Sequence, residues 1–375
     1  MFDQLLSRSH SYRAQNSLLW RLHIDGPLLA GLLCLIAFGL LVLYSAGGEN
    51  AALVKKQVVR LIIAFIAMFM MAQVPPRVLK RWALPLYVGA LLLLVAVLIF
   101  GEVGKGAQRW LHIGIRFQPS EFMKIALPLV VAWYMSERAM PPSLKTLAVA
   151  AMLVLVPTLL IAKQPDLGTS LLIASSGVFV IFLSGISWRR IAISVVSILS
   201  FLPVLWFFLM HDYQRKRVMT FINPGSDPLG ADYQITQSKI AIGSGGLYGK
   251  GWLEGTQSQL EWVPERQTDF IFAVLGEEFG FFGVLLLLAI YLFIIGRGLY
   301  IGAQAQDSFG RLLAGSIILT FSIYIFVNIG MVSDFLPVVG LPLPLVSYGG
   351  TSMVTILASL GILMSIHTHR RLVAN

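Results

Sequence analysis

Residues 27–46 read PLLAGLLCLIAFGLLVLYSA and contain no charged side chain. A transmembrane α-helix needs about 20 apolar residues to cross the hydrocarbon core of a bilayer, and this run has that length. It lacks the polar stripe of a helix that lies on a protein surface. It is also too long for the apolar core of a signal peptide, so we expect it to be a retained first span.

Nine further charge-poor runs follow along the chain. Hydrophobic residues make up 57% of the 375 positions and charged residues only 12%, about half of the 25% that globular proteins carry. Because lipid offers the backbone no hydrogen-bond partners, runs of this length favour helices over barrel strands. We therefore predict an all-α membrane protein of about ten transmembrane helices in one polytopic domain over 1–375, with spans at 27–46, 58–74, 83–100, 120–136, 146–162, 168–186, 191–210, 270–296, 312–332 and 346–366.

The distribution of Lys and Arg predicts the orientation, because loops that stay in the cytoplasm are rich in both. The side that would hold both termini carries 14 of them, and the short loops opposite carry six. We therefore expect both termini inside, with 1–25 as a cytoplasmic tail. The segment 211–268, expected as a large extracytoplasmic loop between the seventh and eighth spans, carries six more. An anionic ligand at the outer surface would explain this excess.

Composition and spacing argue against several classes of site. The formal net charge of +10 follows from the orientation bias and does not indicate nucleic-acid binding. Cys34 is the single cysteine, and the six histidines are scattered, so no metal-ligand cluster is visible. The glycine-rich run 243–251 does not fit a nucleotide loop. A P-loop needs glycine where Ser244 stands, and Tyr248 replaces the third glycine of a dinucleotide fingerprint.

Two charges open the fourth span, in Gln118-Pro119-Ser120-Glu121-Phe122-Met123-Lys124. A charge near the bilayer centre costs about 2.5–3.5 kcal/mol, so both need a reason. Glu121 and Lys124 are three residues apart, so they share a helix face and can pair. Two interpretations stay open: a structural ion pair that fixes the helix, and a part in substrate binding.

Two aspartates stand where a loop enters a span. Asp166, in Gln164-Pro165-Asp166-Leu167-Gly168-Thr169, can cap the sixth helix, which leaves a ligand role open. Thr268 or Asp269 could cap the eighth helix. Asp269 also runs directly into Phe270-Ile271-Phe272, at the boundary of a low-dielectric region where a carboxylate is suited to act as a general base. Glu277 and Glu278 follow about two turns deeper, and we expect them to brace the bundle.

The last outer loop, 334–352, contains three prolines and three glycines. Such irregular backbone is tolerated at membrane depth only against protein or a watery cavity. A hydroxyl and free N–H groups then follow at a helix start, in Ser347, Tyr348, Gly349 and Gly350, and would make an anion-binding site. A plain re-entrant turn is the alternative.

All of these unusual residues fall on one side of the predicted topology. The loops that carry Arg109 and Trp110, Glu121, Asp166, Asp269 and Ser347 would all lie outside, while the inner loops carry only basic flanks and turn residues. This pattern predicts an active or binding site at the outer interface.

These motifs resemble those of the SEDS family of shape, elongation, division and sporulation proteins, over nearly the whole chain. The most specific are QPSE at 118–121, QPDLGT at 164–169, QSKIAIGSGG at 237–246, PER at 264–266, TDFIF at 268–272 and SYGG at 347–350. GKGW at 249–252, PER and the short N-terminal tail resemble the rod-shape elongation members more than the division members. One departure is Gln267, where the family usually has histidine. It puts a role for an imidazole there in doubt and leaves Asp269 intact.

The resemblance implies an inverting peptidoglycan glycosyltransferase in the bacterial cytoplasmic (inner) membrane, which joins lipid II disaccharide-pentapeptides into β-1,4-linked strands during cell elongation. Asp269 is then the expected general base for a sugar hydroxyl, and the leaving pyrophosphate needs positive charge or a metal. No nucleotide is needed, because the donor is already activated. A divalent cation (Mg or Mn) held by carboxylates such as Asp166 is a further expectation. The expected substrate-binding residues are Arg109, Trp110, Glu121, Lys124, Asp166, Arg215, Lys239, Arg266, Ser347, Tyr348, Gly349 and Gly350.

The resemblance also implies partners: a class B penicillin-binding protein that crosslinks the strands, and membrane proteins of an elongation complex. Two other functions stay open. A lipid II carrier or flippase would need polar groups along a path open to both sides of the membrane. A non-catalytic scaffold of the complex would keep glycan synthesis when Asp269 is replaced.

Overall fold

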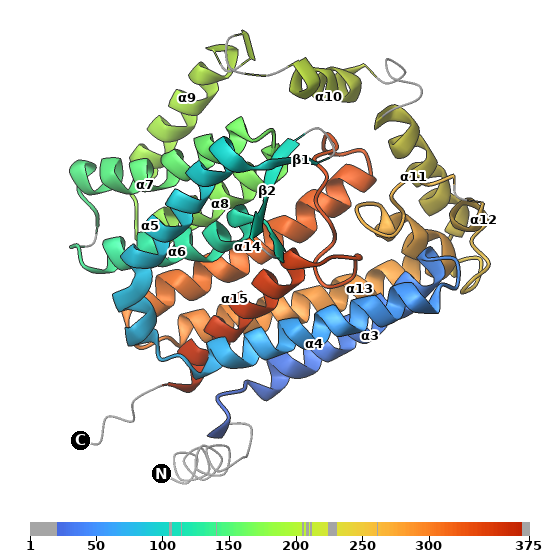
Figure 1. The fold of residues 1–375 in the computed structure, drawn as a ribbon, viewed down its shortest axis with the longest axis horizontal. Helices are drawn as coiled ribbons and strands as arrows, with labels where there is room; N and C mark the ends of the chain where they lie inside the picture. Colours follow the sequence, from blue (N-terminus) through green and yellow to red (C-terminus); the bar gives the residue numbers. More distant parts are fainter. Residues whose placement is uncertain are drawn as a thin grey trace.

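The computed structural model describes residues 21–369, except 105–106, 114, 140, 205, 208–209, 211, 224–230 and 261. Most of the expected tail 1–25 therefore lies outside the described residues. The described part is mainly a bundle of long helices (Figure 1). They are α3 (Gly26–Ala46), α4 (Ala51–Gln73), α5 (Pro76–Phe100), α6 (Pro119–Ser136), α7 (Leu144–Lys163), α8 (Leu167–Leu183), α9 (Trp188–Val204), α13 (Ile271–Ala303), α14 (Ser308–Val332) and α15 (Thr351–Thr368).

Each predicted span overlaps one of these helices. Six of them are long and apolar enough to cross a membrane by length and composition: α3, α5, α7, α13, α14 and α15. α8 is apolar but shorter. The membrane fold is therefore confirmed, whereas the count of ten stays a prediction. Several boundaries differ from the expected ones. α4 and α5 begin at Ala51 and Pro76, before the expected 58 and 83. The last span was expected from residue 346, but its helix begins at Thr351 because the preceding turn is not helical.

Two connections contain structure that the apolar pattern did not predict. Between α5 and α6 the chain forms a three-stranded antiparallel sheet of β1 (Glu102–Gly104), β2 (Ala107–Ile113) and β3 (Ile115–Phe117). The segment expected as one long loop, 211–268, contains α10 (Asp212–Ile222), α11 (Ala231–Gly245) and α12 (Thr256–Gln259). In Figure 1, α11 and α12 lie beside one end of α13.

Close backbone contact holds part of the bundle together. α15 packs along α4, and a Cβ added at Gly361 would stand only 2.2 Å from the carbonyl oxygen of Met68. α14 lies among α6, α8 and α13, and most of its residues are buried. It crosses α8 where Ser316 Oγ donates a hydrogen bond to the Ser176 carbonyl at 2.7 Å.

α13 is two helical segments joined at Gly280, whose backbone (φ 63°, ψ −159°) is not helical. A positive φ of this kind suits glycine, which has no Cβ to clash with the carbonyl oxygen. The first segment starts at Ile271 with Phe270 at the N-cap and no capping side chain. The expectation that Thr268 or Asp269 caps this helix was therefore wrong, because the chain stays in a turn through Phe270.

The two described ends of the chain meet at the end of the bundle opposite the start of α13. The His23 ring stacks on His369 with centroids 3.9 Å apart, and His23 Nδ1 lies 3.2 Å from Thr368 Oγ1. Two histidines thus link the start of α3 to the end of α15. This contact agrees with an even number of spans, which leaves both ends on one side.

Beside this contact, Asp25 forms a buried ion pair that ties α3 to α13. Its carboxylate accepts hydrogen bonds from Arg297 Nε at 3.0 Å and Nη2 at 2.7 Å. His367 Nδ1 lies 2.9 Å from the same carboxylate. Burial alone would raise the pKa of Asp25, but the hydrogen bonds from His367, Arg297 and the Leu28 N–H outweigh it and hold the pKa well below its usual value.

We expect Arg297→Met to lower the unfolding temperature of the purified protein in detergent, because it leaves the buried Asp25 carboxylate without its guanidinium, at a cost of about 3–5 kcal/mol. The same change at the exposed Arg81 is the control. A depressed carboxylate pKa stabilises the fold above the ordinary value of 3.8 and loses that effect as the pH falls through the folded value. Lowering the pH from 7 to 3 should therefore reduce the difference in unfolding temperature between wild type and variant only in part, because the folded pKa lies lower still; an equal difference at pH 7 and pH 3 would contradict this account.

Candidate functional site

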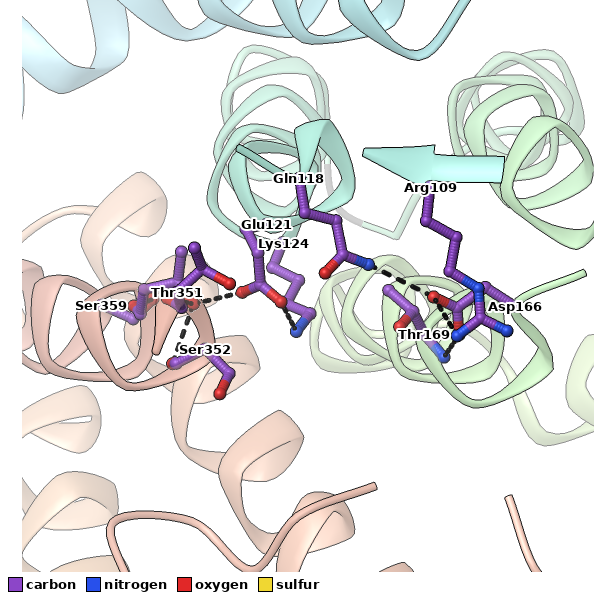
Figure 2. Close-up of polar contacts among 10 residues, drawn as sticks. Arg109, Gln118, Glu121, Lys124, Asp166, Thr169, Thr351, Ser352 and Ser359 are labelled. Carbon is purple, nitrogen blue, oxygen red and sulfur yellow. Dashed lines mark hydrogen bonds and ion pairs between the residues drawn. The ribbon is translucent and has the colours of Figure 1, made fainter. Parts of the chain in front are cut away.

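Arg109 and Asp166 form one half of a polar cluster at the end of the bundle opposite the Asp25 pair. Asp166 caps α8 as predicted, since its side chain accepts the Thr169 N–H at 3.2 Å. Its other carboxylate oxygen lies 3.6 Å from Arg109 Nη1 and accepts a hydrogen bond from Gln118 Nε2 at 3.3 Å. Arg109 also donates to the Pro165 carbonyl. β2 thus places Arg109 beside the start of α8 (Figure 2).

Glu121 and Lys124 form the other half. The predicted pair is present, with Lys124 Nζ 2.7 Å from Glu121 Oε1. The second Glu121 oxygen accepts a hydrogen bond from Thr355 Oγ1 of α15 at 2.6 Å. Glu121 is buried, and Lys124 is largely buried, with 13% of its side chain exposed. Lys124 also lies over the Tyr324 ring of α14, 5.6 Å from its centroid. The pair therefore joins α6 to α14 and α15, and Figure 2 shows it beside the Asp166 half.

The half-buried Asp269 belongs to the same region. Four charged side chains lie close enough to the buried Tyr324 phenol to act on it electrostatically: Lys124, Glu121, Asp269 and Asp166. A backbone contact fixes the position of Asp269, because its carbonyl accepts a hydrogen bond from Asn328 Nδ2 of α14 at 2.9 Å. The structure thus brings together charges that are far apart in the sequence.

The loop before α15 packs against Asp269. Gly340 has a φ of +74°, and a Cβ there would lie 3.5 Å from Asp269 Oδ2. The Ser347 hydroxyl donates to the Thr268 carbonyl at 2.5 Å, and the Tyr348 N–H donates to the Gln267 carbonyl at 2.8 Å. This loop therefore holds the chain on the N-terminal side of Asp269.

The prediction that the N–H groups of this turn are free was partly wrong. The Tyr348 N–H is taken by Gln267, and the Gly349 N–H faces Gln57 Oε1 at 3.5 Å. Ser347 is buried, and its hydroxyl also accepts the Leu343 N–H at 2.7 Å. These groups stabilise an irregular turn, as the alternative interpretation proposed. A part for Tyr348, Gly349 or Gly350 in substrate binding stays a prediction.

Three predicted cations have partners elsewhere. Arg215 donates to the carbonyls of Trp206 at 2.9 Å and Phe207 at 3.0 Å. Lys239 pairs with Asp334 at 2.7 Å. Arg266 is buried and donates to the Ser258 carbonyl. These contacts lie outside the polar cluster, and a part for the three residues in substrate binding stays a prediction.

Glu277 and Glu278 brace the protein as expected, but not deep in the bundle. Glu277 is buried and accepts Lys250 Nζ at 2.7 Å together with the N–H groups of Gln257 and Ser258 at the start of α12. Glu278 accepts from Ser45 near the end of α3. Both bind the 250–258 loop or its neighbours, before the Gly280 bend.

Arg60 and Gln57 of α4 are contacts that the sequence reasoning missed. The Arg60 guanidinium lies over the Tyr348 ring, 4.4 Å from its centroid. Gln57 Nε2 donates to the Ser347 carbonyl at 3.1 Å. The sequence did hold a signal for Arg60, because it is a lone arginine inside the otherwise apolar run 58–74. An arginine at membrane depth costs free energy unless it has a partner.

A pocket opens between α6, α14 and α15 beside this cluster. Lys124, Tyr324, Thr355 and Ser359 supply its polar wall, and apolar residues including Ile317, Phe321, Ile356 and Leu360 supply the rest. Such a site suits an amphipathic ligand, with its charged part toward Lys124 and its apolar part along the helices.

The fold and this cluster define a polytopic membrane protein with a charged cluster at one end of its helical bundle. A family model described as "Cell cycle protein" (FtsW, RodA and SpoVE) matches residues 26–372. The chain therefore belongs to this family, which is the SEDS family expected from the motifs.

Named relatives agree with the family. The chain is 57% identical over 355 residues to the peptidoglycan glycosyltransferase MrdB of Escherichia coli strain K12, covering 94% of this chain and 96% of MrdB. It is 37% identical over 351 residues to the probable peptidoglycan glycosyltransferase FtsW of Geobacter metallireducens, covering 90% and 92%.

Solved structures share the fold. One is a chain from a study of how a peptidoglycan synthase complex coordinates polymerization and crosslinking, with a TM-score of 0.81, 32% identity and coverage of 93% of this chain and 98% of that one. Another is the rod shape determining protein RodA of Thermus thermophilus, with a TM-score of 0.70, 29% identity and coverage of 92% and 98%. The resemblance to the elongation members is thus confirmed.

We expect Glu121→Gln to lower the unfolding temperature markedly, because it leaves the buried Lys124 cation without its carboxylate, at a cost of about 3–5 kcal/mol. The matched control is Glu137→Gln at the other end of α6, where Glu137 is exposed and pairs with Lys80. Exposed pairs stabilise a fold little, so the control should unfold like the wild type. Equal shifts for the two variants in a thermal melt in detergent would refute a buried bracing pair.

Proposed function

We propose that this chain is a peptidoglycan glycosyltransferase that joins lipid II disaccharide-pentapeptides into β-1,4-linked glycan strands during cell elongation. The observation that carries the proposal is that Asp269, Asp166, Glu121 and Lys124 all act electrostatically on the Tyr324 phenol, in a chain 57% identical to a protein of that name. The site combines a carboxylate, two cations and a pocket between helices, which are the parts such a reaction needs.

Asp269 is proposed as the general base. Its carboxylate takes the proton from the 4-hydroxyl of the GlcNAc of one lipid II, and that oxygen attacks C1 of the MurNAc at the end of the growing strand. The bond between C1 and the pyrophosphate oxygen breaks, and the undecaprenyl pyrophosphate leaves with its electron pair. An α-linked donor then gives a β-linked product by inversion. A positioned base of this kind contributes about 10²–10⁴-fold to a rate.

Arg109 and Lys124 are proposed to stabilise the leaving pyrophosphate. Both are held by carboxylates, Arg109 by Asp166 and Lys124 by Glu121, so their positions are fixed before substrate arrives. Preorganised charge is effective because nothing has to reorient during the reaction. The pocket between α6, α14 and α15 is small, about 50 Å³, so it supports only the placing of a charged group beside Lys124 and next to apolar helix faces.

The proposed orientation places this site outside the cell and both termini inside. Two observations support it: the positive-inside count, and the position of the polar cluster at the opposite end of the bundle from His23 and His369. Lipid II would then be presented to Asp269 at the outer surface of the cytoplasmic membrane. A class B penicillin-binding protein is the proposed partner, supported by the match to a chain from a synthase complex that polymerizes and crosslinks.

A divalent cation is a separate proposal. Within the described residues, no group of three or more His, Cys, Asp or Glu side chains could hold one. Asp166 fits the role poorly, because its oxygens already accept hydrogen bonds from Thr169 and Gln118 and face Arg109. The proposed reaction therefore uses no metal bound by the protein, and we propose that Mg²⁺ or Mn²⁺ arrives bound to the substrate pyrophosphate.

We expect Asp269→Asn to abolish strand synthesis by the purified protein, alone or with its transpeptidase, from labelled lipid II, because the amide cannot take the proton. A loss of at least about 100-fold is expected. The matched control is Asp307→Asn, a cap of α14 at the other end of the bundle whose amide can still cap the helix. Both variants should melt like the wild type.

Strand synthesis that survives in a folded Asp269→Asn protein would refute the base assignment. The two alternatives are separated in the same preparation. A carrier would move labelled lipid II across liposomes in a two-sided assay without making polymer. A scaffold would lose complex assembly with Asp269→Asn while polymer formation continued.

Removal of divalent cations with EDTA is expected to slow strand synthesis, and Mg²⁺ or Mn²⁺ should restore it. Since the cation is proposed to bind through the substrate, Asp166→Asn should leave the cation concentration for half-maximal rate unchanged. A large increase in that concentration would instead make Asp166 a metal ligand.

A further inference from the structure

The glycine-rich turn 246–252, which connects α11 to α12, has no part in the proposed reaction. Its backbone pairs with α13 on both sides of the Gly280 bend. The Phe281 and Phe282 N–H groups donate to the carbonyls of Gly246 at 2.9 Å and Leu247 at 3.2 Å. In return, the N–H groups of Lys250 and Gly251 donate to the carbonyls of Glu277 at 3.0 Å and Glu278 at 3.1 Å. The turn thus supplies partners for the backbone groups that the bend removes from the helix.

The contact is close enough to fix the turn in place. A Cβ at Gly249, whose φ is +82°, would stand 2.1 Å from the Glu278 carbonyl oxygen. A Cβ at Gly280 would stand 2.3 Å from the Gly249 nitrogen. The two backbones therefore touch without side chains between them, and the turn must lie at the same depth in the membrane as the bend.

The length of α13 gives that depth. The helix has 33 residues. The segment from Ile271 to Gly280 lies before and at the bend, so about 23 residues follow it. At about 1.5 Å per residue these extend about 34 Å, slightly more than the about 30 Å of hydrocarbon. The bend, and with it the turn, falls at the membrane boundary on the side where Asp269 lies.

The turn carries exposed apolar and aromatic side chains at that boundary. Leu247 is 60% exposed and Tyr248 is 80% exposed. The Tyr248 ring lies 5.3 Å from that of Phe282, and Trp252 lies 5.9 Å from Tyr44 at the end of α3. The patch continues along the exposed face of the α13 span through Phe281, Phe282, Leu285 and Leu286.

We propose that residues 246–252 are an interfacial anchor that inserts Leu247, Tyr248 and Trp252 into the boundary between lipid headgroups and acyl chains. Tyr and Trp favour this depth, because an apolar ring is combined with one polar atom; in Trp252 that atom is satisfied by the protein, since the indole N–H donates to the Leu41 carbonyl at 3.2 Å. A single exposed leucine needs no explanation, but a contiguous apolar patch does. The bilayer is the occupant that the patch fits, since the patch is continuous with the exposed apolar face of a helix long and apolar enough to span the membrane.

The anchor has a consequence for the site. The turn is bonded to Glu277 and Glu278, which lie in the segment of α13 that begins directly after Asp269 and Phe270. Seating the turn in the headgroup region would hold this segment, and Asp269 before it, at a constant depth. The inference concerns membrane contact and does not depend on the reaction.

The test uses spin labels on the full-length protein in liposomes. Leu247→Cys and Tyr248→Cys are each made with Cys34→Ser, labelled in detergent and reconstituted. Glu254→Cys is the matched aqueous control, because Glu254 is exposed in the same loop two residues after Trp252. The unaltered chain, labelled at the exposed Cys34 in the middle of α3, is the lipid reference.

Accessibility to oxygen, which enters lipid, is compared with accessibility to a nickel chelate, which stays in water. The anchor predicts that labels at 247 and 248 have much lower nickel accessibility than the label at 254, with oxygen accessibility between that of the label at 254 and that of the deeper Cys34. Nickel accessibility at 247 and 248 equal to that at 254 would overturn the proposal. So would labels that become protected only when the transpeptidase is added, because the patch would then be a protein docking surface.

Discussion

The structure depends on one constraint: backbone N–H and C=O groups at membrane depth must find partners within the protein. Helices satisfy it by themselves, and the chain breaks helix in only a few described places near the membrane. At Gly280 the turn 246–252 supplies the missing partners. Before α15, Gln267 and Thr268 accept hydrogen bonds from Tyr348 and Ser347. At this second break the hydrogen-bond partners are the residues next to Asp269. The hydrogen bonds that satisfy the irregular backbone therefore also position the proposed base.

Charges follow a similar rule, because an unpaired ion in a low-dielectric interior is costly. The Asp25–Arg297 pair lies at one end of the bundle, and the Glu121–Lys124 and Arg109–Asp166 pairs lie at the other. The two ends differ in what surrounds the pairs. Asp25 joins helices α3 and α13 among histidines, whereas Lys124 borders a pocket and Asp166 faces a strand outside the helices. Pairing therefore stabilises the bundle at both ends, and Lys124 of one pair also lines a pocket.

Particular residues show how far sequence reasoning reached. The Glu121–Lys124 pair and the Asp166 cap depend on residues three apart in one helix, so spacing predicted them correctly. The cap expected at Thr268 or Asp269 failed, because tertiary contacts from Ser347 and Tyr348 hold that segment in a turn. The Lys239 contact with Asp334 joins residues 95 positions apart, and Arg60 reaches Tyr348 from another helix. No local pattern encodes such distances.

By itself, the sequence determined that this is a helical membrane protein, roughly where its long apolar helices lie, and which residues break the apolar pattern. It could do so because crossing lipid requires long apolar runs, and because each polar residue within them has a cost that local spacing makes visible. Only the tertiary structure decided which of those polar residues meet. The packing of α6, α8, α14 and α15 places Lys124, Asp166 and Asp269 around Tyr324, while Arg215, Lys239 and Arg266 bind elsewhere. Contacts between helices follow from the shapes of their buried faces, and those are set by the whole bundle rather than by any one run.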